Sequence, residues 1–216
     1  MGSSIRSALD PFQQELLEAF FDRERRFFLT GGAALAGFHL GHRTTHDLDL
    51  FTVEHVLEEG VSVLHEVAGE LGASLESLRT APDFHRVLVT RGSDSVVVDL
   101  VHERAPQLSE KVRFGRISVD PPEEILANKL CTLLSRAEIR DLVDVRALEQ
   151  AGYRIEDSLE PASRKDGGLS PGQLAWVLSE IEIGEDAEPP GVSAPELREY
   201  LDDLIRRLTR RAFPAE

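Results

Sequence analysis

The sequence predicts an α/β (α+β) fold, with a mixed sheet in residues 1–120 and helices in residues 121–216. Before residue 120, short apolar runs with strand character alternate with helical runs, and glycines separate them. After residue 120, apolar residues recur at helical spacing and prolines mark helix starts. A chain of 216 residues can form one sizeable α/β domain, or a small catalytic domain with a helical appendage.

The elements expected in the first part begin with a helix at Asp10 and Pro11, an N-cap followed by a proline in the first turn. A glycine pair then separates a strand from a short helix that Gly41 ends. Later β-type runs include a hairpin through the Gly-containing segment 91–94. The expected ranges are helices over 10–21, 33–40 and 61–71, and strands over 27–30, 48–52, 73–78, 86–90, 95–101 and 115–119.

The second part is predicted to be helical, and its first helix has the clearest start. Asp120 suits an N-cap, and the two prolines and two glutamates that follow it suit the first turn of a helix. Ser170 and Pro171 mark a later start, for a helix in which Trp176 is expected to pack with its apolar neighbours. The expected ranges are helices over 125–135 and 138–148, from 170 and from 195, with a polar connection over 156–168 and a loop over 187–193.

A glycine pair and an Asp-x-Asp pair form the candidate site. Gly31 and Gly32 follow an apolar strand and open a helix-forming run, where free backbone N–H groups and the helix dipole favour phosphate. Asp47 and Asp49 are two residues apart in an alternating segment, so in a strand both carboxylates point to one face. Carboxylates are depleted from strands, and two that converge on one place indicate a bound cation, which we expect to be Mg²⁺.

Asp99 is the candidate third carboxylate. It lies in a run over 95–101 that is otherwise almost wholly apolar, and a buried acid needs a partner. The alternative is an acid that caps a turn at a strand end, although Leu100 and Val101 continue the strand.

These residues carry a resemblance to a known family. Gly31-Gly32, a spacer of fourteen residues from 33 to 46 and then Asp47-x-Asp49 resemble the first motif of polymerase-β-type nucleotidyltransferases. The longer string, 29–36 with Gly41-His42-Arg43 and 47–51, is similar to the AbiEii/AbiGii toxin branch, which includes the MenT-type toxins.

The resemblance implies a nucleotidyltransferase core that binds an NTP with Mg²⁺ or Mn²⁺. Many superfamily members have Gly-Ser in place of the two glycines, so here backbone amides must supply more of the phosphate contact. Arg43 either reaches a phosphate or pairs with one of the nearby acids. Asp99, by the same resemblance, deprotonates or positions the attacking hydroxyl. The implied NTP-binding residues are Gly31, Gly32, Ala33 and Arg43, and the implied metal ligands are Asp47, Asp49 and Asp99.

A second block in the helical part is similar to the second conserved block of the AbiEii branch. That similarity implies that Lys129, with Arg136, holds the NTP phosphates and that Asp141 orients or activates nearby groups. Spacing alone leaves two acids open. One unbroken helix would bring Asp144 nearer to the face of Lys129, whereas a break near Arg136 to Glu138 would favour Asp141. The alternative for the whole block is a set of surface ion pairs.

The resemblance further implies the toxin of a toxin–antitoxin or phage-defence pair, with an antitoxin protein as partner. The implied reaction is attack of an acceptor hydroxyl on the α-phosphate of an NTP, with pyrophosphate leaving. The first expected acceptor is RNA, at the 3′ end of tRNA, and the second is a protein hydroxyl. Two alternatives stay open: an aminoglycoside-like antibiotic nucleotidyltransferase, and a degenerate fold that binds nucleotide or a partner without chemistry.

Charge and composition bear on these choices. The net charge of −15 suits a cationic small substrate, since proteins that hold RNA normally present a basic surface. Nine acids and one basic residue lie in 180–203, however, so a basic site elsewhere is compatible with this charge. Three histidines at 39, 42 and 46 suggest zinc only weakly, because a glycine interrupts them and a fourth ligand is missing.

We expect a cytoplasmic protein that does not enter a membrane. No apolar run approaches the roughly 20 residues needed to span a bilayer. The first ten residues lack the apolar core of a signal peptide. The single cysteine, Cys131, excludes an internal disulfide and favours a reducing compartment.

Overall fold

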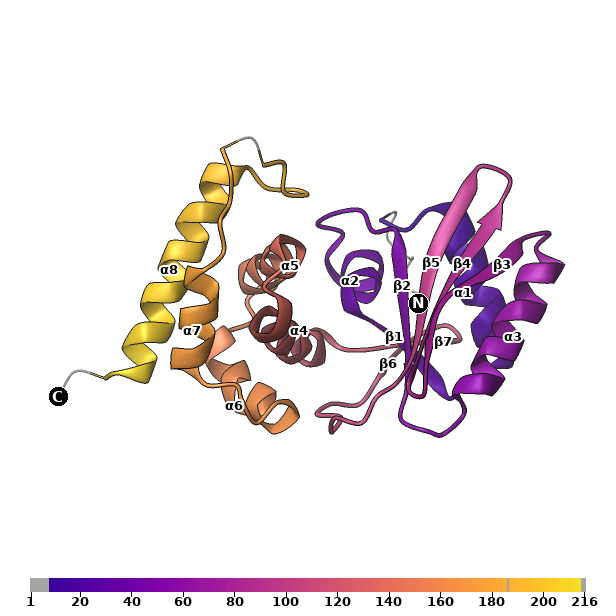
Figure 1. Ribbon diagram of the computed structural model, residues 1–216, viewed down its shortest axis with the longest axis horizontal. Coiled ribbons are helices and arrows are strands. Elements are labelled where there is room, and N and C mark those ends of the chain that lie inside the picture. Colours follow the sequence, from indigo (N-terminus) through magenta and orange to yellow (C-terminus); the bar gives the residue numbers. More distant parts are fainter. Residues whose placement is uncertain (1–7, 186, 215–216) are drawn as a thin grey trace. The chain divides into compact units, whose positions relative to one another are not determined.

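The computed structural model describes residues 8–185 and 187–214, and the chain divides into two compact units (Figure 1). The first unit consists of the chain up to Arg104 together with Ser109–Pro121, and the second consists of Ala105–Leu108 together with the chain from Pro122 onward. A short piece of the second unit therefore precedes, in sequence, the last strands of the first.

Within the described residues, the first unit is built on a mixed sheet of seven strands. The strands are β1 Phe27–Thr30, β2 Asp47–Thr52, β3 Ser74–Ala81, β4 Phe84–Arg91, β5 Asp94–His102, β6 Val112–Phe114 and β7 Ile117–Val119. Their order across the sheet is β3-β4-β5-β2-β1-β7-β6. β2 pairs parallel with β5, β1 pairs parallel with β7, and the other neighbours pair antiparallel. The predicted mixed α/β fold is confirmed.

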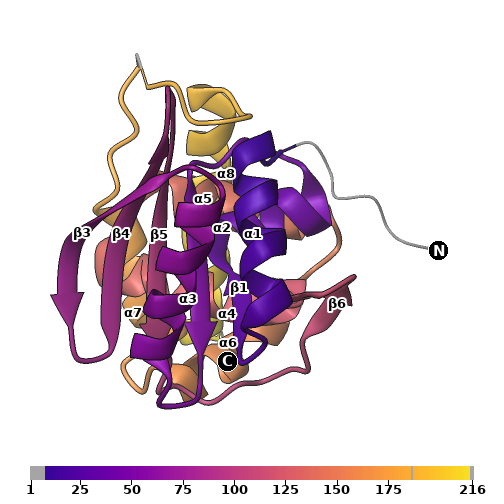
Figure 2. The ribbon, with the colours of Figure 1, turned by 90° about the vertical axis from the view of Figure 1, so that its right-hand side faces the viewer.

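Two helices, α1 Pro11–Arg23 and α3 Leu57–Glu70, pack against one face of this sheet, and Figure 2 shows both in front of the strands. α1 begins with a capping box, in which Asp10 accepts from the backbone of Gln13 and the Gln13 side chain accepts from the backbone of Asp10. α3 starts four residues before the expected position, and two glutamates in its first turn favour this start.

The opposite face of the sheet carries the polar positions of β2. Along this strand, Asp47, Asp49 and Phe51 are half-buried and alternate with three buried residues, Leu48, Leu50 and Thr52. Because successive strand residues point to opposite faces, both carboxylates share the face that α1 and α3 leave open. The alternating pattern in the sequence predicted this arrangement.

The glycine pair leads straight into a helix. α2, Gly31–Ala34, begins at the first glycine, two residues before the expected start, and continues as a π-helix, η1, over Leu35–Leu40. Gly41 ends the helix with φ +64, as its left-handed conformation allows.

Two expectations near the end of the first unit need correction. The strand expected over 115–119 is present as β7, but it starts two residues later, because Gly115 turns the chain with φ +64 between β6 and β7, which form a hairpin. Asp120 does not start the next helix, which begins at Pro122; its carboxylate accepts instead from Lys111.

Five helices make up the second unit within the described residues: α4 Pro122–Arg136, α5 Ile139–Gln150, α6 Ile155–Lys165, α7 Pro171–Ser179 and α8 Ala194–Ala212. The polar connection expected over 156–168 is wrong, because α6 occupies most of it. Its buried residues Ile155, Leu159 and Ala162 recur at helical spacing in spite of Pro161. No helix among residues 8–185 and 187–214 combines the length and the apolar composition needed to cross a membrane.

Trp176 does not pack as expected, because its side chain is 62% exposed. Leu174 and Leu178 on the same helix are buried, and a residue two positions from either of them points to roughly the opposite side. The buried face of α7 packs on α8, which begins with a capping box between Ser193 and Glu196.

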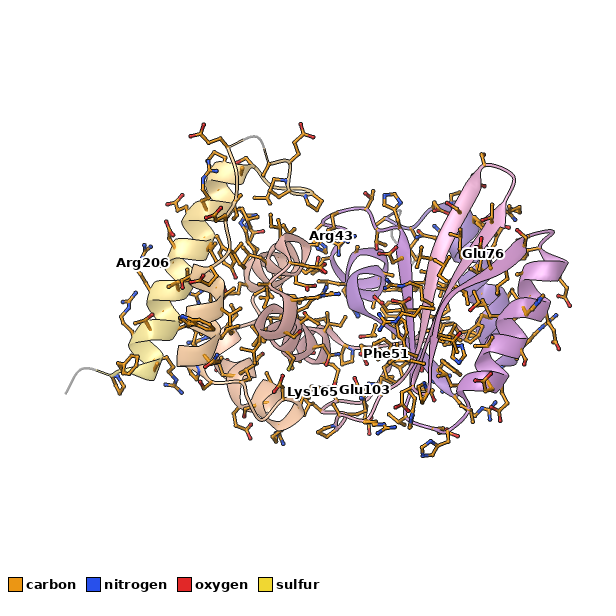
Figure 3. All side chains as sticks on the ribbon, in the orientation of Figure 1. Arg43, Phe51, Glu76, Glu103, Lys165 and Arg206 are labelled. Atoms are coloured by element: carbon orange, nitrogen blue, oxygen red, sulfur yellow. The ribbon has the colours of Figure 1, made fainter. Side chains whose placement is uncertain are left out.

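A buried ion pair joins α6 to α4. The Nζ of Lys165 (Figure 3) lies 2.5 Å from Oε1 of Glu124, and their side chains are 3% and 0% exposed. The second carboxylate oxygen of Glu124 accepts from the backbone of Leu108 at 2.8 Å. This contact attaches the segment Ala105–Leu108 to the helical unit.

We predict that Gly60→Ala destabilises the first unit by about 1–3 kcal/mol, the usual cost of overpacking. A Cβ on Gly60 would lie 2.4 Å from the Phe27 ring. Gly69 on the same helix has no heavy atom of the described chain within 4 Å of that position. Gly69→Ala should therefore stabilise the protein by about 0.5–1 kcal/mol through helix propensity. Denaturant unfolding followed by circular dichroism measures both, and equal effects would contradict the packing of α3 on β1.

Candidate active site

The turn after β1 brings Gly31 against the carboxylate of Asp49. Thr30, the last residue of β1, pairs with Asp49 across the sheet, and the chain turns at Gly31 with φ +64. A Cβ on Gly31 would lie 2.0 Å from Oδ2 of Asp49, so only glycine leaves room for the carboxylate. The glycine thus allows an acid to lie beside a helix N-terminus.

Arg43 covers Gly32 in a similar way. A Cβ on Gly32 would lie 2.4 Å from Nη2 of Arg43, whose Nη1 donates to the carbonyl of Thr44 at 3.0 Å. Figure 3 shows Arg43 beside α2. The first N–H groups of a helix have no acceptor within it, so the turn from Gly31 to Ala33 presents backbone donors next to a guanidinium group. Such a turn can bind a phosphate group.

Four residues from adjacent strands form a row across the open face of the sheet. The register pairs Asp49 with Asp99 of β5, Asp99 with Arg86 of β4, and Asp49 with Thr30. Directly opposed residues share a face, and neighbouring strands are about 4.8 Å apart. We call Arg86, Asp99, Asp49 and Thr30 the cross-strand row. Asp47 lies two residues from Asp49 along β2, on the same face.

Thr30 ends the cross-strand row with a buried hydroxyl. The residue is 3% exposed, and its Oγ1 has no hydrogen-bond partner in the described part of the chain. A buried hydroxyl without a partner is costly. Its position beside Asp49 and Gly31 suits a ligand oxygen, and it is an observation in favour of a bound ligand that does not depend on the acids.

The sequence did not predict two members of the row, Thr30 and Arg86. The Nε of Arg86 donates to Oδ1 of Asp99 at 2.8 Å, and its Nη2 donates to Oδ2 at 2.6 Å. Such two-bond pairs are among the strongest in proteins. The predicted third carboxylate therefore has a buried position beside Asp49, with 7% exposure, and an arginine partner.

The residues of the first unit fit a divalent metal held by protein and substrate together. Asp47 and Asp49 offer the carboxylate oxygens that Mg²⁺ prefers, and Mg²⁺ commonly takes its remaining ligands from substrate phosphates and water. Asp99 lies beside them, but both of its oxygens are bonded to Arg86. Among residues 8–185 and 187–214, no three or more His, Cys, Asp or Glu side chains, the three histidines included, are arranged to hold a metal by themselves. The metal role of Asp99 stays a prediction.

In the second unit, Lys129 lies between two buried acids. Its Nζ is 2.6 Å from Oδ1 of Asp141 and 2.7 Å from Oδ2 of Asp144, and Nε of Arg136 is 3.1 Å from Oδ2 of Asp141. The helix breaks between α4 and α5, where Ala137 has φ +49. The break turns α5 so that both acids, and not one of them, contact the lysine. We call Lys129, Asp141 and Asp144 the lysine cluster.

The lysine cluster is charged as well as buried. Burial by itself lowers the pKa of Lys129, but the charges of Asp144 and Asp141 outweigh it, so the pKa lies above its ordinary value. Because the folded-state pKa is raised, the stabilisation is fully present below the unfolded-state pKa, neutral pH included. It is lost only as the pH rises through the folded-state value. A surface ion-pair set does not describe this block, since Lys129 is 7% exposed and both acids less than that.

Comparison with known proteins points to one family. A family model described as the nucleotidyl transferase AbiEii toxin of a type IV toxin–antitoxin system matches residues 15–215. No curated protein sequence matches the chain.

Among the solved structures that are similar to this chain, three share its fold at 16% sequence identity. A Helicobacter pylori protein provisionally described as a nucleotidyltransferase has a TM-score of 0.61, with 92% of each chain covered. JHP933 from Helicobacter pylori has a TM-score of 0.56, with 93% of this chain and 91% of that chain covered. MenT4, the nucleotidyltransferase toxin Rv2826c of Mycobacterium tuberculosis H37Rv, has a TM-score of 0.54, with 95% and 82% covered.

We predict that Lys129→Met destabilises the second unit by about 3–5 kcal/mol, because it removes the buried cation that lies between two buried carboxylates. Arg164→Met is the matched control. Arg164 is 57% exposed and pairs with Glu160 on the surface of α6, so its loss should change stability by less than about 1 kcal/mol. Urea unfolding measures both. A loss for Lys129→Met as small as that of the control would contradict a buried cluster.

Proposed function

Because the chain belongs to the AbiEii family of nucleotidyl transferase toxins, we propose that it moves a nucleotide from an NTP to a hydroxyl group of RNA with the help of a divalent metal ion. The match over residues 15–215 includes both the glycine turn and the lysine cluster. The observation that supports a metal-dependent reaction is the close approach of Gly31 and the Asp49 side chain. It sets a carboxylate against a helix N-terminus, a place suited to bind phosphate.

In this proposal Asp47 and Asp49 hold Mg²⁺ or Mn²⁺, which would neutralise charge that develops on the phosphates during transfer. Backbone N–H groups from Gly31 to Ala33 donate to phosphate oxygens, and the buried hydroxyl of Thr30 donates to an oxygen beside them. Arg43, next to Gly32, supplies a second cation for the same group.

The transfer itself needs a hydroxyl to be aligned with the α-phosphate. A bond forms between the acceptor oxygen and the α-phosphorus, and the bond from that phosphorus to the pyrophosphate oxygen breaks. Asp99 would accept or orient the proton of the attacking hydroxyl. Lys129 and Arg136 would bind phosphate, and Asp141 would orient Lys129, with which it shares a hydrogen bond of 2.6 Å. Asp144 makes an equally short contact and would share this role.

RNA is the proposed acceptor, with the 3′ end of tRNA as the first candidate, and the family's type IV system provides an antitoxin as the functional counterpart. The acceptor proposal rests on the family. The net charge of −15 favours a cationic small molecule instead, and this is the second candidate. Incubation with Mg²⁺, each labelled NTP in turn and either total tRNA or aminoglycosides separates them. Labelled tRNA supports the first candidate, and a labelled small molecule with unlabelled tRNA rejects it.

We predict that Asp49→Asn lowers transfer by more than about 100-fold, because it removes a proposed metal ligand, and even the outer partners of metal sites cost 10–100-fold. Asp94→Asn removes the same charge from an exposed position on β5 and should leave the rate within about twofold. Label transfer at saturating Mg²⁺ is the measurement, with thermal unfolding to verify the fold. Full turnover by Asp49→Asn would refute the metal assignment.

We also predict that Gly31→Ala abolishes transfer while Gly115→Ala does not. Both glycines have φ +64, so alanine costs each a similar 1–2 kcal/mol of backbone strain. They differ in surroundings: a Cβ on Gly31 meets the Asp49 carboxylate, and one on Gly115 has no heavy atom of the described chain within 4 Å. Activity is measured at a temperature where both variants are folded, so that a difference between them reports the effect of displacing the Asp49 carboxylate. Equal activities would mean that its position is unimportant.

A further inference from the structure

Arg86 and Asp99 form an unequal pair. Asp99 is fixed, because it is 7% exposed and lies within β5 between strands β4 and β2. Arg86 is 47% exposed at its side chain, so its charged end can leave the carboxylate without disturbing packed residues. The carboxylate is thus fixed within the sheet, whereas the side chain that donates to it is half exposed.

The guanidinium group also interacts with the other acids of this face. Its hydrogen bonds to Asp99 raise the pKa of Arg86, burial opposes them, and the charges of Asp47 and Asp49 add to the increase. The positive charge of Arg86 thus interacts with three carboxylates on the same face of the sheet. A divalent cation bound by these acids would meet that positive charge, and it could use Asp99 fully only if Arg86 gave up its bonds.

We propose that Arg86 is a positioning residue that competes with the divalent cation for Asp99 and so lowers the metal affinity of the site. This inference rests on the proposed function, because it takes the acids of this face as the metal site. Arg86 compensates Asp99 before metal and NTP arrive. Its release from Asp99 then frees a guanidinium group beside the triphosphate, where planar two-bond contacts to phosphate are favourable.

Arg79 provides a matched control on the same face. It lies opposite Arg86 in the register of β3 and β4, and each guanidinium carbon is 5.7 Å from the centre of the Phe84 ring. The two arginines therefore share an aromatic contact and a charge. They differ in their contact with Asp99, which accepts two hydrogen bonds from Arg86.

The experiment measures Mn²⁺ binding to the full chain without NTP, from the electron paramagnetic resonance signal of free Mn²⁺. Arg86→Gln should bind Mn²⁺ roughly fivefold more tightly or better, at the lower end of the usual coupling between sites. Arg86→Lys keeps the charge but loses the planar guanidinium group that makes two hydrogen bonds to one carboxylate. Its Mn²⁺ affinity should therefore lie between those of wild type and Arg86→Gln. Arg79→Gln should stay within about twofold of wild type, because its charge lies one strand further from the acids and is screened.

Asp49→Asn in the same assay distinguishes two kinds of failure. If wild type binds no Mn²⁺, or if Asp49→Asn binds Mn²⁺ as tightly as wild type, the metal part of the proposed function fails. The role of Arg86 then fails with it. If the binding depends on Asp49 but Arg86→Gln leaves it unchanged or weakens it, only the role of Arg86 is overturned. Thermal unfolding without metal identifies a merely structural role, in which Arg86→Gln lowers stability and leaves Mn²⁺ affinity at the wild-type value.

Discussion

The parallel pairing of β2 with β5 is the constraint on which the rest of the site depends. It sets Asp49 directly beside Asp99, and the antiparallel pairing of β1 with β2 sets Thr30 on the other side of Asp49. A slip of one residue would turn the acids toward the helix-covered face, where leucines now lie. The same register brings the Asp49 carboxylate against Gly31, so the shape of the turn and the position of the acid are fixed together.

Buried carboxylates need a compensating cation, and the two units supply it in different ways. In the first unit, half-exposed Arg86 compensates Asp99, and we propose that a divalent cation competes with it there. In the second unit, Lys129 is buried together with the acids it binds, so the lysine cluster stabilises its helices at neutral pH and resists rearrangement. A phosphate that recruited Lys129 would have to compete with two short ion pairs. In the proposed function, Asp141 and Asp144 would therefore affect phosphate binding by Lys129 as well as stability.

Much of the first unit could be predicted from local patterns. The alternation of Asp47 to Thr52 placed both acids on one face, and the apolar run around Asp99 marked an inner strand. Arg86 was missed although its signal was present: a hairpin that pairs residue 91 with 94 also pairs 86 with 99. Other misses depended on tertiary context. Pro161 and several charges concealed α6, which packs through only a few apolar residues, and Trp176 lies on an exposed face that composition alone did not reveal. The sequence left open a break near Arg136 to Glu138, where Ala137 has φ +49, but spacing could not show that the break brings both acids to Lys129.

The most direct test of the central claim is a crystal structure of the protein with Mn²⁺ and a non-hydrolysable NTP analogue, with the metal located by anomalous scattering. A manganese peak bound by Asp47 and Asp49, with the triphosphate on the backbone N–H groups from Gly31 to Ala33, is the predicted result. Manganese bound away from both acids, or a triphosphate that does not contact the glycine turn, would contradict it.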